Sequence, residues 1–210
     1  MTTSLKTRDE TGVRIDPQDD RFDRTSIILH WVTVLLITIQ FGSIWARETI
    51  SHQGGLAALL LSLHRAMGLL TWAVVAARLI WRRYFAHVPD FPTNMPIVQQ
   101  LVAKANEHSL YIMLLAVPAT GLARALLRGR PLDLLIWQVP ALMNPHPAMQ
   151  SVFAEAHEAA ATVLMILIGL HVGAALFHHA ILRDDVLQRM TPEMPSRKPL
   201  MPASGIDKRE

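Results

Sequence analysis

The sequence contains no cysteine among its 210 residues. Disulfide bonds, thiolate-bound iron–sulfur clusters and covalently attached c-type haem are therefore excluded, since each of them needs cysteine sulfur. Polar surface is also scarce, because hydrophobic residues make up 51% of the chain and the mean hydropathy is positive. A soluble protein of this length needs more polar residues. With ten histidines present, imidazole is left as the obvious metal ligand.

The sequence also lacks nucleic-acid motifs, and we expect residues 1–24 not to be a signal peptide. The arginines flank apolar runs and form no basic stripe, so we expect no nucleic-acid partner. The first apolar stretch starts late, is too long for a signal peptide and has no small-residue cleavage site. We interpret residues 1–24 as a cytoplasmic arm, residues 25–190 as one membrane domain, and residues 191–210, rich in proline, lysine and arginine, as a cytoplasmic tail.

Four apolar runs predict transmembrane helices, at residues 26–46, 57–81, 108–127 and 152–182. Each reaches the length of about 20 residues that a bilayer core requires. Proline and charged residues mark the breaks between them. The sequence therefore predicts an all-α fold, an integral four-helix bundle that crosses the lipid bilayer several times.

Basic residues indicate the orientation, because they concentrate on the cytoplasmic side of membrane proteins. With both termini inside, the outer side carries only five of the 20 lysines and arginines, namely Arg47, Arg65, Arg124, Arg128 and Arg130. All the others then lie on the inner side. We therefore predict an N-in, C-in bundle.

Several histidines lie within or at the ends of the apolar runs: His30, His64, His108, His157, His171, His178 and His179. Ionisable groups inside a membrane are costly, so they are candidates for function. A hydrogen bond between helices explains any single one of them equally well. Their depths in the membrane favour a functional interpretation.

Depth sorts four of these histidines into two pairs. His30 lies near the inner end of the first run, and His64 lies near the outer end of the second. The fourth run carries His157 at its outer start and His171 fourteen residues deeper. Fourteen residues give about 21 Å of rise and roughly four turns, so both rings share one face. The expected pairs are His30 with His171, and His64 with His157.

Two axial imidazoles from facing helices suit a low-spin b-type haem, and two pairs predict two such haems, which carry electrons and do not bind oxygen readily. Zinc is disfavoured, because it takes three or four ligands at one point. Gly68 lies one turn after His64 and leaves room for a porphyrin, although close helix packing explains a small residue as well. Arg78 lies on the His64 face at the inner level. It needs an anion there, which the propionates of the inner haem would supply, or it snorkels to the headgroups.

The motifs occur in a specific order: Leu29-His30-Trp31, His64-Arg65-Ala66-Met67-Gly68, Arg78-Leu79-Ile80-Trp81-Arg82, His108-Ser109-Leu110-Tyr111, Pro118-Ala119-Thr120-Gly121, and then His157, residues 169–179 and residues 184–192. In this order they resemble the bacterial cytochrome b561 family, over residues 21–192. The four haem ligands of the family match His30, His64, His157 and His171. Glu107 departs from the pattern, since a glycine is common at that place.

The resemblance implies an oxidoreductase of the bacterial inner membrane. Some members resemble superoxide oxidases, which pass the electron of superoxide through two haems to ubiquinone. The same motifs occur in cytochrome b subunits that anchor hydrogenases and formate dehydrogenases, so an electron-transfer subunit fed by a periplasmic donor is the alternative. A non-redox bundle with structural histidines is a third possibility, which an absorbance spectrum would exclude.

Two further sites follow from this expectation. His178 shares the His171 face about two turns deeper, and it is the candidate proton donor to quinone, although it also suits a solvated helix end. Arg124, Arg128 and Arg130 cluster with only Asp133 near them in sequence. They predict a positive funnel for superoxide, or alternatively headgroup and propionate pairing. We expect the apolar residues 134–140 to lie along the membrane face above the outer haem.

Overall fold

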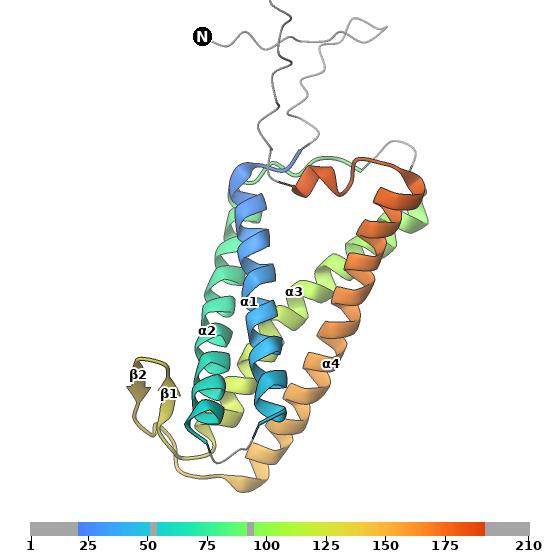
Figure 1. Ribbon diagram of the computed structural model, residues 1–210. Helices are drawn as coiled ribbons and strands as arrows, with labels where there is room; N and C mark the ends of the chain where they lie inside the picture. Colours follow the sequence, from blue (N-terminus) through green and yellow to red (C-terminus); the bar gives the residue numbers. More distant parts are fainter. Residues whose placement is uncertain (1–20, 51–53, 92–94, 192–210) are drawn as a thin grey trace, which may run out of the picture.

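The computed structural model describes residues 21–50, 54–91 and 95–191. Its four long helices are labelled in Figure 1: α1 (Arg24–Glu48), α2 (Gly55–Tyr84), α3 (Ile97–Leu126) and α4 (Pro147–Phe177). A π-helical turn at His178–Leu182 continues α4, and a short 3-10 helix follows at Gln188–Met190. All four helices, with α4 counted to Leu182, are long and apolar enough to cross a membrane. The prediction of four such helices is confirmed.

The third helix begins at Ile97, well before the start predicted at residue 108. Lys104 and Glu107 made residues 97–107 too polar to be counted in the apolar run. In the structure, Arg82 of α2 forms a salt bridge of 2.9 Å with Glu107. Because residues 97–107 contain no glycine or proline, the helix continues through them.

The connection between α3 and α4 contains the two short strands of an otherwise helical fold. Leu132–Leu134 (β1) and Trp137–Val139 (β2) pair as a short antiparallel hairpin. Leu135, in the turn between them, has φ 62°, and its N–H donates to the hydroxyl of Ser62 on α2. Leu132 is buried. The apolar stretch expected along the membrane face therefore folds as a hairpin against α2.

The helices form two antiparallel pairs, α1 with α2 and α3 with α4, and contacts between α2 and α3 join the pairs (Figure 1). The buried core comprises Val75, Leu114, Val117 and Leu164, from α2, α3 and α4. Many other large apolar side chains are exposed, which fits surroundings of lipid tails as apolar as the side chains themselves.

Both described ends of the chain lie at the same end of the bundle, which we call the N/C end. The guanidinium of Arg21 donates to the carbonyls of Gln188 and Thr191. Asp23 caps α1 through Ser26 and accepts from the indole of Trp81. Burial acts to raise the pKa of Asp23, but these hydrogen bonds outweigh it and leave the pKa below its ordinary value.

We call the opposite end, which carries β1 and β2, the hairpin end. The predicted arm and tail, residues 1–24 and 191–210, lie almost wholly outside the described residues.

Candidate metal centres

His64 of α2 and His157 of α4 face each other at the hairpin end. Their ring centroids are 6.2 Å apart and the rings are nearly perpendicular. The Nδ1–H of His64 donates to the carbonyl of Gln40 (3.1 Å), and that of His157 donates to the carbonyl of Val117 (3.0 Å). Such bonds fix the tautomer and leave Nε2 of each ring with a free lone pair. Two oriented imidazoles of this kind form a ligand pair.

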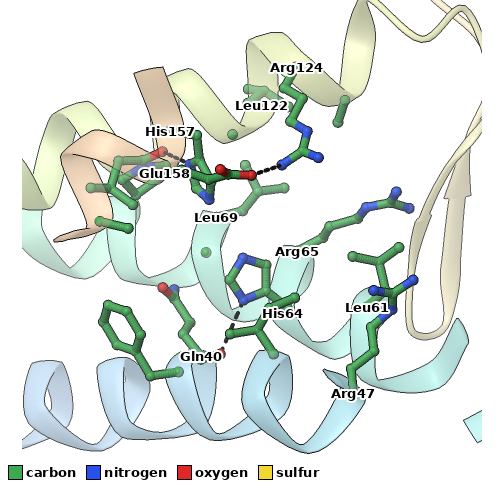
Figure 2. Close-up of a pocket in the computed structure, with 18 of the residues that line it drawn as sticks. Gln40, Arg47, Leu61, His64, Arg65, Leu69, Leu122, Arg124, His157 and Glu158 are labelled. Carbon is green, nitrogen blue, oxygen red and sulfur yellow. Dashed lines mark hydrogen bonds and ion pairs between the residues drawn. The ribbon is translucent and has the colours of Figure 1, made fainter. Parts of the chain in front are cut away.

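A cavity of about 670 Å³ surrounds this pair and is lined by residues of all four helices (Figure 2). An imidazole nitrogen lies about 2 Å from a first-row metal ion, so a centroid separation of 6.2 Å leaves room for one ion between the rings. The volume is in the range of cofactor pockets, roughly 300–1,000 Å³. The geometry therefore fits a planar cofactor with a central metal and two axial imidazoles.

Glycines allow the close packing around this pair. A Cβ at Gly121 of α3 would approach Cε1 of His157 to 2.9 Å, which is closer than real contacts. Gly68 also lines the cavity, but a Cβ there would meet only the amide nitrogen of Gln40, at 3.7 Å. Among the protein atoms, the strict steric requirement thus falls on Gly121, which the sequence analysis did not select as a site residue.

His30 of α1 and His171 of α4 form the second pair, towards the N/C end. Their ring centroids are also 6.2 Å apart, with an angle of 59° between the planes. Nδ1 of His30 is buried and has no hydrogen-bond partner among the described residues. The same separation again leaves room for one metal ion between two imidazoles. The two pairs predicted from depth are brought together in space.

Arg78 of α2 lies near enough to His30 and His171 to interact electrostatically with both. Its guanidinium carbon lies 5.4 Å from the ring centroid of Tyr111 on α3. The hydroxyl of Tyr111 is buried and has no partner among the described residues. Within the same part of the chain, Glu107 pairs with Arg82, and no carboxylate lies within ion-pair distance of Arg78. A cation and a hydroxyl are thus available to a carboxylate of a bound cofactor.

Within the described part of the chain, each of the two centres offers two histidines as metal ligands. Among the described residues, no three histidine, cysteine or carboxylate side chains gather at one point. Zinc requires three or four such ligands, whereas haem supplies four nitrogens of its own and needs only axial ligands. Haem fits the residues present and zinc does not.

Arginines gather on one flank of the hairpin-end cavity (Figure 2). The cavity is lined by Arg47, Arg65, Arg124 and Arg128. Arg130 instead lines a second cavity, of about 350 Å³, beside Arg128. Burial and the neighbouring cations Arg124, Arg130 and Arg47 lower the pKa of Arg128 from its ordinary value.

Asp133 is the one carboxylate near the arginines in sequence, but another carboxylate approaches them from α4. Oε1 of Glu158 lies 4.0 Å from the guanidinium of Arg124. Glu158 is largely exposed, so this contact offsets little of the positive charge. The flank of the cavity stays strongly positive, and Arg47 and Arg65 contribute to it more directly than Arg130.

His178, the candidate proton donor, lies in the π-helical turn after α4. Its Nδ1–H donates to the carboxylate of Asp184. Asp184 was not among the candidate residues, because it lies beyond the predicted end of the fourth helix at residue 182. A regular helix continued to it would have placed it on a different face from His178.

The model of the prokaryotic cytochrome b561 family matches residues 21–193. The chain is 31% identical to cytochrome b561 homolog 1 of Escherichia coli K12, over 85% of this chain and 99% of the relative. It is 28% identical to the probable superoxide oxidase CybB of Yersinia pestis, over 82% of this chain and 97% of the relative. Four apolar helices and these matches make it a bacterial membrane protein with an oxidoreductase role. The chain belongs to the prokaryotic cytochrome b561 family, whose role is electron transfer in the membrane with b-type haem.

Proposed function

We propose that this protein is a di-haem cytochrome b that oxidises superoxide on the periplasmic side of the bacterial inner membrane and reduces ubiquinone on the cytoplasmic side. The observation that supports it best is the presence of two imidazole pairs, each with centroids 6.2 Å apart, towards opposite ends of one bundle. Such an arrangement provides two one-electron sites in series across a bilayer.

The proposed orientation places the N/C end in the cytoplasm and the hairpin end in the periplasm. It is supported by the distribution of basic residues, of which the hairpin end carries five out of 20. The proposed organisation is a multi-pass membrane domain at residues 25–190 between a cytoplasmic arm and a cytoplasmic tail.

In this proposal, His64 and His157 are the axial ligands at the periplasmic level, and His30 and His171 are those at the cytoplasmic level. When bound, b-type haem supplies one-electron redox chemistry and, with both axial positions filled, does not bind oxygen readily. The carbonyls of Gln40 and Val117 orient the periplasmic ligands.

Arg78 and Gly68 serve the cofactors in different ways. Arg78, together with the hydroxyl of Tyr111, holds a propionate of the cytoplasmic haem. The Tyr111 hydroxyl is buried without a hydrogen-bond partner among the described residues, and the half-buried guanidinium of Arg78 lies beside it without a carboxylate of the described chain at ion-pair distance. Gly68 lines the periplasmic cavity and leaves room for the porphyrin.

The arginine flank of the periplasmic cavity is the proposed entry for superoxide. Superoxide is an anion, and a positive field above a cavity raises the arrival rate of anions by about tenfold or more. Arg124 and Arg128 line the cavity and guide the anion inward, while Arg130 extends the field beside it. The name of the relative from Yersinia pestis, a probable superoxide oxidase, points the same way.

Ubiquinone reduction is placed near the cytoplasmic pair, with His178 as the proton donor. His178 follows His171 by about two helical turns, or roughly 10 Å. Quinone reduction consumes protons, and histidine exchanges protons near neutral pH.

Stopped-flow absorbance of the purified, haem-loaded protein tests this function. Superoxide generated in the drive syringe should reduce the haems within the mixing experiment, and ubiquinone should reoxidise them. If superoxide leaves the haems oxidised while a chemical reductant reduces them, the donor is a different molecule. The alternative role, an electron-transfer or anchor subunit of a dehydrogenase or hydrogenase, then takes precedence, and co-purification in mild detergent identifies the partner.

A further inference from the structure

His178 and Asp184 form a shielded, hydrogen-bonded pair just after α4, where the chain turns to cross the N/C end (Figure 1). The His178 side chain is 13% exposed and that of Asp184 is 26% exposed. Neighbouring side chains of the same turn, such as Ile181 and Leu182, are exposed. The imidazole and the carboxylate are therefore turned inward where the apolar side chains are not.

The backbone departs from regular helix to make this pair. The α-helix widens into a π-helical turn at His178–Leu182, and Arg183 then takes a left-handed conformation with φ 55°. This conformation is unfavourable for a residue with a Cβ, and π-helical turns are frequent at functional sites. The N–H of Asp184 donates to the carbonyl of His178 at 3.2 Å. The distorted turn thus brings the Asp184 carboxylate back onto the His178 ring.

We propose that Asp184 is a positioning residue for His178 in quinone reduction. The inference rests on the function proposed above and adds to it the residue that orients the proton donor. By accepting the hydrogen bond from Nδ1, the carboxylate fixes the tautomer and the orientation of the ring. Nε2 is then the atom that takes a proton from water and passes it to a quinone oxygen.

The overall reaction balances with the reactants already named. Reduction of one ubiquinone to ubiquinol takes up two electrons and two protons. The electrons come from two superoxide anions, each oxidised to dioxygen, and the protons come from cytoplasmic water, one of them through Nε2 of His178. The imidazole regains its proton from water after each turnover.

Asp185 provides a matched control, because it is the adjacent carboxylate and is exposed. The hydrogen bond of His178 goes to Asp184 and not to Asp185. Asp184→Asn removes the charge and keeps the size of the side chain. Asp184→Glu keeps the charge. Each variant is first examined for an unchanged low-spin haem spectrum and haem content, which excludes general unfolding.

The experiment follows reoxidation of the reduced haems by a short-chain ubiquinone in stopped flow, over a range of quinone concentrations. Loss of an oriented proton donor should lower the limiting rate of Asp184→Asn by about tenfold to a hundredfold, with little change in the quinone concentration giving half the limiting rate. Asp184→Glu should recover part of the rate, and Asp185→Asn should match the unmodified protein.

An unchanged limiting rate in Asp184→Asn would overturn the inference, as would equal losses in the Asp184 and Asp185 variants. These outcomes differ from a failure of the proposed function itself. If superoxide alone fails to reduce the haems of the unmodified protein, the Asp184 variants are still compared with chemically reduced haems. If ubiquinone fails to reoxidise the haems of the unmodified protein, both the proposed function and this inference are overturned.

Discussion

At the scale of single residues, the contact between Gly121 and His157 constrains the centre at the hairpin end most tightly. A Cβ at position 121 would lie 2.9 Å from the imidazole of His157. In Gly121→Ala the His157 ring must therefore move away from its position opposite His64. We predict loss of the periplasmic haem or its conversion to a high-spin form, with the cytoplasmic haem retained. Haem content and the absorbance spectrum measure this. Gly42→Ala is the control, since a Cβ there meets nothing within 4 Å. Two intact low-spin haems in Gly121→Ala would contradict the prediction.

Arg78 gives a second prediction at this scale. A cation near the cytoplasmic haem favours the reduced form electrostatically, so Arg78→Leu should lower its midpoint potential, by a shift on the order of 50 mV. Tyr111→Phe should lower it by less, because only a neutral hydrogen-bond donor is lost. Arg83→Leu, an exposed position near the end of α2, should leave the potential unchanged. A redox titration in which Arg78→Leu and Arg83→Leu behave alike would argue against propionate binding by Arg78.

The sequence predicts the depth and the face of residues on one helix better than it predicts which residues of neighbouring helices touch. The regular rise of a helix converts the spacing of His157 and His171 into depth, so the two pairs followed from the sequence. The approach of Gly121 to His157, or of Tyr111 to Arg78, depends on how α3 packs laterally, which spacing along the chain does not encode. Asp184 was missed for a related reason. The π-helical turn and the left-handed Arg183 interrupt the regular helical period from which positions along the fourth helix were predicted.

At the scale of elements, the proposed function makes the end of α3 and the connection that follows it the entry route of an anion to the centre at the hairpin end. Salt screens exposed charges over about 10 Å at 0.1 M, so haem reduction by superoxide should slow as ionic strength rises. Changing Arg124, Arg128 and Arg130 together to glutamine should slow it by about tenfold. Among single changes, Arg128→Gln should slow the reduction more than Arg130→Gln. Of these two arginines, Arg128 lines the cavity around His64 and His157, and Arg130 does not. A rate indifferent to both salt and these substitutions would remove the arginine entry site from the proposal.

The same elements explain where the predicted boundaries differed from the structure. The third apolar run was cut short at residue 108 because Lys104 and Glu107 lowered its hydropathy, whereas the salt bridge between Arg82 and Glu107 accommodates this segment against α2. The β1–β2 hairpin was missed because a three-residue strand provides too short an alternation to be distinguished from an apolar loop. Neither difference moves a histidine of the two pairs.

At the scale of the whole molecule, the orientation in the membrane is open to a direct test. If the N/C end is cytoplasmic, green fluorescent protein fused after residue 210 should fluoresce in bacterial cells, and alkaline phosphatase fused there should be inactive. Alkaline phosphatase inserted in the loop after α1 should be active. The reverse pattern would place the arginine-lined cavity in the cytoplasm and would invert the proposed direction of electron flow.

The central claim is that each of the two imidazole pairs holds one haem. Its most direct test is the haem content of the purified protein, measured together with low-temperature electron paramagnetic resonance. The account predicts two low-spin haems per chain, one of which is lost or becomes high-spin in His64→Ala and the other in His30→Ala. A single haem per chain, or two low-spin haems that both persist in His64→Ala, would contradict it.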